Sequence, residues 1–330
     1  MAGRGWVRAS LGALVPAVVL AALGGAALWR YRASGPLPSD RAIVVPAGST
    51  ARVSRALAHD GAIEEPRLFV LAALATSRAG PLRAGEFEFP RHASYARVLE
   101  VLRKGVPVEH RVTIPEGLTA QEIAALLEKA PALSGPVSIP AEAWVLPNTY
   151  DYLYGTKRQA IVQRAHAALE AKLAKLWARR APDLPVSTPE QALVLASIVT
   201  RETALPAERP QVSAVYLNRL KLGMPLDADP TVIYAASGGS GRLPGPITAA
   251  DLKMPSPYNT YRQAGLPPGP IDAPGIAAIT AVLHPATSDD LYFVADGTGG
   301  HAFARTLAEQ NRNVARWHAT LDQQAETGTR

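Results

Sequence analysis

Twenty consecutive residues without a charged side chain, close to the N-terminus, constrain this chain more than any other feature. The stretch from Ser10 to Trp29 reads SLGALVPAVVLAALGGAALW. As a helix it would extend about 30 Å, the thickness of the hydrocarbon core of a bilayer. Trp29 and Tyr31 form an aromatic pair typical of a membrane interface, and no small-x-small cleavage site follows. The pattern therefore predicts an uncleaved transmembrane helix over residues 10–29 rather than a signal peptide.

Arginine residues stand on both sides of this predicted helix. Arg4 and Arg8 precede it and Arg30 and Arg32 follow it, so the arginine count does not settle the orientation. The amino terminus adds one positive charge to the short side. This charge favours residues 1–9 as a cytoplasmic tail, with the rest of the chain on the outer face.

The overall composition is that of a globular protein enriched by one apolar segment. The 330 residues are 48% hydrophobic and 19% charged, and a chain of this length typically forms about two domains. The net charge of +6 includes no dense basic run, so we expect no nucleic-acid partner. The absence of cysteine excludes disulfides and thiolate chemistry. The seven histidines lack metal-ligand spacing and no phosphate-loop or dinucleotide motif occurs, so we expect neither a metal nor a cofactor.

Residues 30–40, rich in Pro, Gly and Ser, predict a linker, and a small domain is expected over residues 41–139. Ile43 to Thr50 (IVVPAGST) and Val112 to Thr119 (VTIPEGLT) each predict a strand that leads through Pro-x-Gly-x-Thr into a helix. The second segment resembles the opening of a LysM module, a small βααβ fold that binds N-acetylglucosamine polymers. Alternatively, these elements only pack against the next domain and hold no sugar, because the sequence shows no exposed aromatic platform.

A helix that ends in an acidic residue is predicted in the second half of the chain. Thr188 and Pro189 are typical N-cap and first-turn residues. Apolar residues at helical spacing follow, and Glu202 continues their stripe seven residues after Leu195. Glu202 also lies in the last turn before Pro206, where the helix dipole disfavours negative charge. Both effects should raise its pKa.

A carboxyl group that is protonated near neutral pH can give a proton to a leaving oxygen and later take one back. Glu202 is therefore a candidate acid/base residue for glycoside chemistry. The alternative is that Glu202 is a boundary residue at the end of an amphipathic helix whose carboxylate simply reaches water.

A series of motifs resembles one known family. ASIVTRET, VYLNRL, LDADPTVIY, SPYNTY, GLPPGPI and GGHAF occur in this order. The series resembles that of the endolytic murein transglycosylases, the YceG-like or MltG family. The likeness runs from about Ala192 to Asn311 and more weakly back to Ile43. It implies an α+β protein in which a mixed α+β catalytic domain, over residues 140–325, follows the anchor and the LysM-like domain.

The resemblance also implies which residues form the site. The family commonly has Glu-Lys-Glu where this chain has Thr200-Arg201-Glu202, so the catalytic role carries over to Glu202. A preceding motif, residues 142–150, has Asn148 where the family usually has an acid, which makes a second catalytic carboxylate there unexpected. The implied substrate-binding residues are Asn218, Tyr258, Asn259, Tyr261 and His301.

The activity implied is that of a lytic transglycosylase, a lyase that acts on peptidoglycan. It would cleave the β-1,4 bond between N-acetylmuramic acid and N-acetylglucosamine inside nascent strands, leave a 1,6-anhydro end and so help to terminate strand elongation. Such an enzyme would lie in the inner (cytoplasmic) membrane with its catalytic domain facing the periplasm and cell wall, with peptidoglycan synthases as possible partners. Two alternatives stay open: a non-catalytic peptidoglycan-binding membrane protein, and a hydrolytic muramidase, which needs a second acid. The candidates for that acid are Asp227, Asp229 and Asp272.

Overall fold

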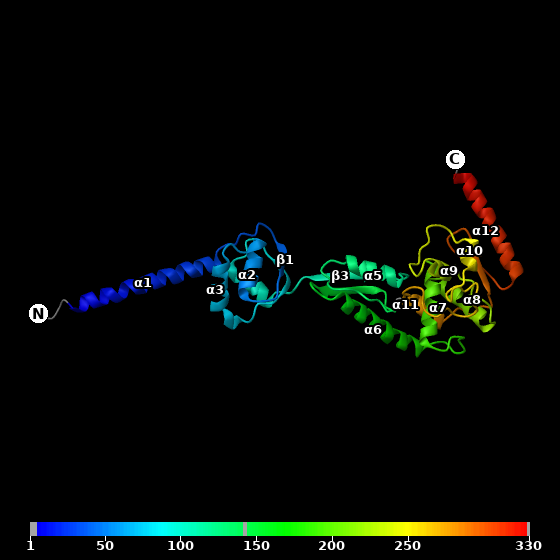
Figure 1. Cartoon of the computed structure of the whole chain (residues 1–330), viewed down its shortest axis with the longest axis horizontal. Coiled ribbons are helices and arrows are strands. Elements are labelled where there is room, and N and C mark those ends of the chain that lie inside the picture. The colour runs from blue at the N-terminus through cyan, green and yellow to red at the C-terminus, as the bar shows by residue number, and fades with distance from the viewer. Residues whose placement is uncertain (1–4, 141–143, 329–330) are drawn as a thin grey trace. The chain divides into compact units, whose positions relative to one another are not determined.

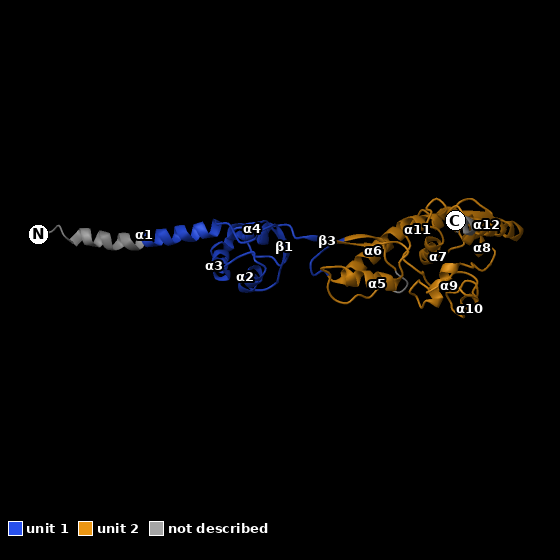
Figure 2. Cartoon of the chain, turned by 90° about the horizontal axis from the view of Figure 1, so that it is seen from above, with its two compact units in different colours: residues 1–110, 151–156 blue, residues 111–150, 157–330 orange. Residues whose placement is uncertain are grey.

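The computed structural model describes the backbone of residues 5–140 and 144–328, and Figure 1 shows the order of its helices and strands. Side chains are described from residue 18 to residue 323 apart from the gap. The chain divides into two compact units, which Figure 2 distinguishes by colour. Unit 1 contains residues 1–110 and 151–156, and unit 2 contains residues 111–150 and 157–330. The mixture of helices and strands confirms the predicted α+β class.

The first helix, α1, covers Gly5–Arg32 and so includes the predicted transmembrane segment. The side chains of residues 10–17 of that segment lie outside the described part of the chain. Over the residues that are described, no helix combines the length and the apolar character needed to cross a membrane.

Unit 1 is built around one antiparallel pair of strands. Its elements are β1 (Arg41–Val45), α2 (Thr50–His59), α3 (Pro66–Ala75), a short 3-10 turn (Ser77–Ala79), β2 (Gly85–Phe89) and α4 (Tyr95–Lys104). Strands β1 and β2 pair with Ile43 opposite Phe87. Alternate residues of each strand face inward, and Phe87 and Phe89 are fully buried against Phe69 of α3 and Leu99 of α4. The strand and the helix predicted from Ile43 onward are confirmed as β1 and α2.

The strand–helix unit predicted around residue 112 is also present, and all of it after His110 belongs to unit 2. Strand β3 (Glu109–Ile114) leads into α5 (Ala120–Lys129), and β3 pairs with β4 (Asn148–Leu153), which precedes α6 (Arg158–Trp177). The Thr119 side chain and Glu122 form a reciprocal capping box at the start of α5. Glu142 and Ala143 of the motif expected before β4 lie outside the described residues.

The boundary between the compact units falls after His110, whereas the sequence suggested a domain boundary after residue 139. Long-range contacts explain the difference. The amide of Gly117 donates to the carbonyl of Ala273 at 2.9 Å, and the amide of Ala273 donates to Leu118 at 2.9 Å. The buried guanidinium of Arg209 pairs with Glu116 at 2.6 Å. Residues 111–130 are therefore tied to the later part of the chain.

The rest of unit 2 is a helical core with a hairpin and a closing helix. Its elements are α7 (Pro189–Glu202), α8 (Arg209–Lys221), α9 (Asp229–Ala236), α10 (Ala249–Lys253), α11 (Ile276–Leu283), β5 (Tyr292–Ala295), β6 (His301–Ala304) and α12 (Leu307–Gly328). Helix α7 is the centre of the core, because every residue from 192 to 199 is buried. Helices α8 and α11 pack on α7, and β5 pairs antiparallel with β6.

Candidate active site

Helix α7 places Glu202 at its C-terminal end. The Thr188 hydroxyl accepts a hydrogen bond from the amide of Gln191, and Pro189 occupies the first turn, so the helix begins where the sequence predicts. It ends at Glu202 because Thr203 has extended backbone angles. The burial of α7 holds the backbone of Glu202 against the core of unit 2.

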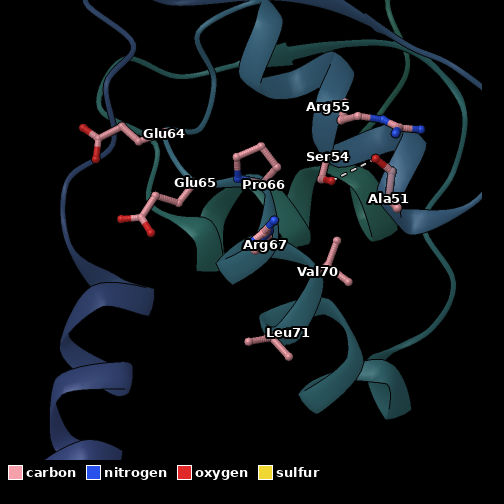
Figure 3. A pocket seen from close by; sticks show the side chains of 9 residues that line it. All are labelled: Ala51, Ser54, Arg55, Glu64, Glu65, Pro66, Arg67, Val70 and Leu71. Carbon is pink, nitrogen blue, oxygen red and sulfur yellow. Dashed lines mark hydrogen bonds between the residues drawn. The ribbon is translucent and has the colours of Figure 1, made fainter.

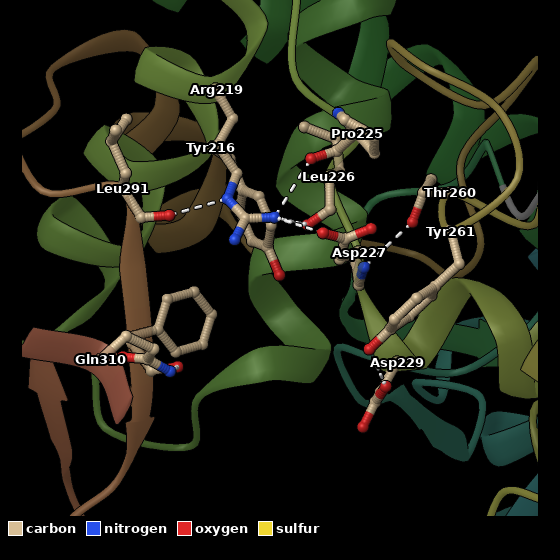
Figure 4. A network of polar contacts seen from close by, with 12 residues as sticks. Tyr216, Arg219, Pro225, Leu226, Asp227, Asp229, Thr260, Tyr261, Leu291 and Gln310 are labelled. Carbon is tan, nitrogen blue, oxygen red and sulfur yellow. Dashed lines mark hydrogen bonds and ion pairs between the residues drawn. The ribbon is translucent and has the colours of Figure 1, made fainter. Parts of the chain in front are cut away.

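Glu202 lines a cavity of about 270 Å³ whose other walls come from α8, the segment before α9, the loop at Tyr261, the β5–β6 hairpin and α12. Figure 4 shows part of this surface. The lining residues are Glu202, Tyr216, Arg219, Leu226, Asp227, Asp229, Tyr261, Phe293, Val294, Ala295, His301 and Trp317. Acidic, basic and aromatic side chains thus meet around one carboxyl group.

Burial dominates the electrostatics of Glu202. It raises the pKa of this carboxyl group from its usual value near 4.5 to about 7. The Tyr216 hydroxyl, which donates a hydrogen bond to Glu202 Oε1, and the positive charge of Arg219 act in the opposite direction, whereas the negative charge of Asp229 adds to the rise. The predicted raised pKa is confirmed, and desolvation is its main cause.

The positive charge of Arg219 lowers the pKa of Glu202. The hydrogen bonds of Arg219, however, go to backbone carbonyls and to Asp227 rather than to Glu202. Its Nε donates to the carbonyl of Leu291 at 2.7 Å, and its Nη1 donates to Leu226 O at 3.0 Å and to Asp227 Oδ2 at 2.9 Å (Figure 4). The side chain of Arg219 is only 10% exposed. Arg219 therefore fixes the loop that carries Asp227, and its charge lowers the pKa of Glu202 less than burial raises it.

Tyr261 and Asp229 form a second polar pair in the cavity. The Tyr261 hydroxyl donates to Asp229 Oδ1 at 2.7 Å (Figure 4). Burial and this bond raise the pKa of Tyr261, so the phenol stays protonated and remains a donor. Asp229 is thus held at the cavity wall by a neutral donor, which leaves a negative charge opposite Glu202.

His301 is oriented by a carboxylate on the chain between α7 and α8. Its backbone amide donates to Glu208 Oε1 at 2.8 Å, and its Nδ1 lies 2.7 Å from Glu208 Oε2. The Thr203 hydroxyl donates to the same carboxylate at 3.1 Å. Burial alone would raise the pKa of Glu208, but the bonds from His301 and Thr203 outweigh it and lower the pKa below its usual value. His301 therefore enters the cavity wall with its ring orientation fixed.

The structure brings together Glu202, Tyr261 and His301 from the predicted site, and it places the other three predicted residues elsewhere. Asn218 lies on α8 and donates from Nδ2 to the carbonyls of Ser288 at 2.8 Å and Asp290 at 3.1 Å. Asn218 therefore holds the segment before β5 in place.

Tyr258 and Asn259 lie in the loop that precedes Tyr261, and their side chains make contacts within unit 2. The ring of Tyr258 packs 4.9 Å from the ring of Tyr234, within the core of unit 2. Asn259 is completely buried, and its Nδ2 donates to carbonyls at the end of α10 (Asp251, Leu252 and Met254). The prediction that Asn259 binds substrate is not supported by this geometry, because its amide is used to satisfy backbone oxygens.

The three candidates for a second catalytic carboxylate lie in different surroundings. Asp227 and Asp229 line the cavity with Glu202. Asp272 is fully buried, and within the described part of the chain neither of its carboxyl oxygens has a hydrogen-bond partner. Burial raises the pKa of Asp272 well above its usual value, and Asp272 does not line the cavity with Glu202.

Sequence reasoning missed several cavity residues. Tyr216 and Arg219 were not among the predicted site residues, although the two lie three residues apart on α8 and therefore share a face. That spacing is the signal that could have found them. Trp317 had no comparable signal, because its position depends on how α12 returns to the hairpin. Among the described residues, no group of three or more His, Asp and Glu side chains is placed to hold a metal ion.

Comparison with known proteins gives a consistent result. A sequence model of the YceG-like family matches residues 43–316. The endolytic murein transglycosylase of Streptococcus pneumoniae serotype 2 (strain D39) is 29% identical over 284 residues, which cover 71% of this chain and 50% of that protein. The protein of the same name from Bacillus subtilis (strain 168) is 35% identical over 178 residues, 52% of this chain and 47% of that protein. The chain thus spans about half the length of these curated relatives.

A solved structure is also similar. The crystal structure of a yceG-like protein from Listeria monocytogenes aligns with a TM-score of 0.53 and 26% sequence identity, over 83% of this chain and 98% of that one.

Proposed function

This chain belongs to the YceG-like family, and from that premise we propose that it is an endolytic peptidoglycan lytic transglycosylase. It cleaves the β-1,4 bond from N-acetylmuramic acid to N-acetylglucosamine within a strand and leaves a 1,6-anhydro end. The observation that carries the proposal is a single carboxyl group, Glu202, with its pKa raised to about 7, in a polar cavity next to aromatic side chains. The likeness of the chain to proteins named endolytic murein transglycosylase supports peptidoglycan as the substrate class.

In the proposed reaction Glu202 acts first as an acid and then as a base. Protonated Glu202 gives its proton to the glycosidic oxygen as the bond from C1 of the muramic acid to that oxygen breaks. The resulting carboxylate then accepts the proton of the muramic acid 6-hydroxyl while that oxygen bonds to C1. No water is consumed, and Glu202 ends protonated as it began.

The neighbours of Glu202 have complementary roles in this scheme. The donor Tyr216 and the charge of Arg219 stabilise the carboxylate between the two steps. The negative charge of Asp229 stabilises the positive charge that develops at the sugar C1. Tyr261, His301 and Trp317 supply ring surfaces and hydrogen-bonding groups for the strand at the cavity wall.

The proposal is tested by digestion of purified sacculi with the protein and its Glu202→Gln variant, followed by mass spectrometry of the products. The wild type should release anhydro-muropeptides, and Glu202→Gln should lose about 100-fold or more of the rate, the usual contribution of a general acid. Glu190→Gln is the matched control, because Glu190 is exposed at the other end of the same helix. Equal release by wild type and Glu202→Gln would contradict the role of Glu202, and no release by either protein would favour the alternative of a non-catalytic wall-binding protein.

A hydrolytic muramidase is the second candidate, because Asp227 and Asp229 line the same cavity as Glu202. Such an enzyme would use one of them to activate water or to stabilise an intermediate. Asp227 is paired with Arg219, which leaves Asp229 as the better placed acid. The product decides between the two reactions: a reducing N-acetylmuramic acid end requires water, and an anhydro end excludes it.

We also propose a membrane anchor at residues 10–29, which places the protein in the inner membrane with unit 2 facing the periplasm and cell wall. Peptidoglycan synthases would be its partners there. Its cleavage of nascent strands would help to terminate their elongation. The uncharged stretch and the continuous helix α1 support the anchor. A LysM-like domain over residues 41–139 is also part of the proposal. The strand–helix–helix–strand order of β1, α2, α3 and β2, with β1 and β2 antiparallel, supports it for the part that lies in unit 1, whereas residues 111–139, which include the LysM-like segment, lie in unit 2.

A further inference from the structure

Helix α3 exposes a stripe of leucine side chains on the surface of unit 1. Leu68, Leu71 and Leu74 are 36%, 61% and 60% exposed. On the opposite side of the same helix Phe69 and Ala73 are buried in the core of unit 1. Helix α3 is thus apolar on both sides, although only one side faces the protein interior. An exposed aliphatic face of this kind usually marks a contact with a membrane or another protein.

The leucine face lies beside the end of α1. A hollow of about 410 Å³ is lined by Ala27, Leu28 and Tyr31 of α1 and by Leu68 and Leu71 of α3. Leu28 and Trp29 are themselves 52% and 71% exposed. The exposed apolar surface therefore continues from the last turns of α1 onto α3.

Polar contacts fix this arrangement at the exit of α1. The Arg30 guanidinium pairs with Glu64 and lies 3.4 Å from Glu65, the residue before α3. It also lies over the ring of Tyr95, 5.9 Å from the centroid. The start of α3 is thus held at the level of Arg30, one residue after the uncharged stretch ends.

From these contacts we propose that the leucine face of α3 rests in the surface layer of the membrane that α1 enters, with lipid as its partner. The inference rests on the proposed anchor. If residues 10–29 span the bilayer, Ala27 and Leu28 lie inside it, within about 3 Å of Trp29 along the helix axis. Leu71 borders the same hollow as these two residues. Interfacial helices bury their apolar faces about 5–10 Å deep, and the proposal places Leu71 at such a depth.

The charges around the leucine face fit an anionic surface. Arg67 precedes Leu71 by one helical turn, Arg78 lies in the 3-10 turn that follows α3, and both are exposed. Figure 3 shows Arg67 and Leu71 beside a hollow of about 870 Å³ that Arg55 of α2 also lines. Lipid phosphates attract such arginine side chains. The acidic residues of the same hollow, Glu64 and Glu65, are paired with Arg30.

The chain has no cysteine, so single labelling sites can test the inference on the full-length protein. Leu71→Cys, Leu20→Cys and Glu88→Cys each receive an environment-sensitive fluorophore, and each variant is reconstituted into phosphatidylglycerol-containing vesicles. In one set of vesicles some of the lipid carries a nitroxide quencher near the headgroup, which reports position 71, and in a second set it carries the quencher deep in the acyl chain, which reports position 20 near the bilayer centre. Leu20 reports the anchor. Glu88 is the control, because it is exposed on β2 between the buried Phe87 and Phe89 and so points away from the core.

We expect the headgroup quencher to lower the fluorescence at position 71, the acyl-chain quencher to lower it at position 20, and neither quencher to lower it at position 88. Quenching at position 20 together with a position 71 that behaves like position 88 would overturn the inference and leave the anchor intact. The same holds if position 71 is shielded both from the lipid quencher and from aqueous iodide, since a protein would then cover the face. Absence of quenching at position 20 would remove the proposed anchor, and the inference with it.

Discussion

At the scale of single residues, the carboxyl groups of unit 2 differ because their partners differ. Glu202 is desolvated and receives one hydrogen bond from Tyr216, and its pKa rises to about 7. Glu208 accepts hydrogen bonds from His301 and Thr203, and its pKa falls. Asp272 is buried without such partners among the described residues, and its pKa rises well above its usual value. The number of donors decides whether a buried acid is charged.

The balance at Glu202 leads to a prediction for Tyr216→Phe. Because Glu202 must be protonated to act as an acid, activity should fall as the pH rises through about 7. The Tyr216 hydroxyl favours the carboxylate, so its removal should raise the pKa of Glu202 and move this basic limb to higher pH by about one unit. The measurement is the pH dependence of kcat/KM.

Tyr154→Phe is the control for this experiment, since Tyr154 is 46% exposed and lies in unit 1. A basic limb that stays in place in Tyr216→Phe, or moves to lower pH, would contradict the assignment of that limb to Glu202.

The sequence predicted the central acid but not most of its surroundings. The helical position of Glu202 is a local property, so capping and periodicity were enough to predict it. The approach of Tyr216, Arg219 and Asp229 depends on how the chain folds back after Pro206, and no local pattern encodes that. Asn259 was misjudged for the converse reason: a loop rich in turn residues suggests a groove wall, but its amide completes the end of α10.

At the scale of elements, α7 was predictable because Thr188, Pro189 and an apolar stripe mark its start and its buried side. Helix α3 was not predicted, because its sequence PRLFVLAALA is apolar on nearly every side and shows no helical stripe. The attachment of residues 111–130 to unit 2 was not predicted either. It rests on partners far apart in sequence, such as Arg209 and Glu116.

The close approach of Gly275 to the Glu116 side chain gives a prediction for Gly275→Ala. Gly275 is the N-cap of α11, and a Cβ there would lie 1.6 Å from Glu116 Oε2. The Glu116 side chain would have to move, which would leave the buried guanidinium of Arg209 without its partner. We expect a loss of about 1–3 kcal/mol in the free energy of unfolding of unit 2, measured by denaturant titration.

Gly245→Ala is the matched control, because no atom lies within 4 Å of the Cβ it would add. Glu116→Gln should reproduce most of the loss caused by Gly275→Ala. If Gly275→Ala leaves the free energy of unfolding unchanged while Glu116→Gln lowers it, a Cβ at position 275 does not displace the Glu116 side chain from Arg209.

At the scale of the whole molecule, the two compact units have separate apolar cores. The core of unit 1 gathers around Phe69, Phe87 and Phe89. The core of unit 2 gathers around α7 and includes Leu195 and Ile279. Among the described residues, no buried side chain belongs to both clusters. Each core therefore stabilises its own unit.

Separate cores predict that the units unfold in separate transitions, which Phe69→Ala can reveal. Phe69 is fully buried in unit 1, so its truncation should lower the stability of that unit by about 3–5 kcal/mol. The transition of unit 2 should not move. Differential scanning calorimetry of the full chain in detergent, with Leu71→Ala on the exposed side of the same helix as control, measures both. A single transition that shifts as a whole would contradict independent units.

The buried acid at position 272 has a consequence beyond its own surroundings. The formal charge of +6 counts every carboxyl group as ionised, but burial raises the pKa of Asp272 well above its usual value and the pKa of Glu202 to about 7. The folded chain therefore keeps these protons to a higher pH than the unfolded chain does. Unfolding in urea at about pH 6 should thus release protons into an unbuffered solution, which a pH electrode measures.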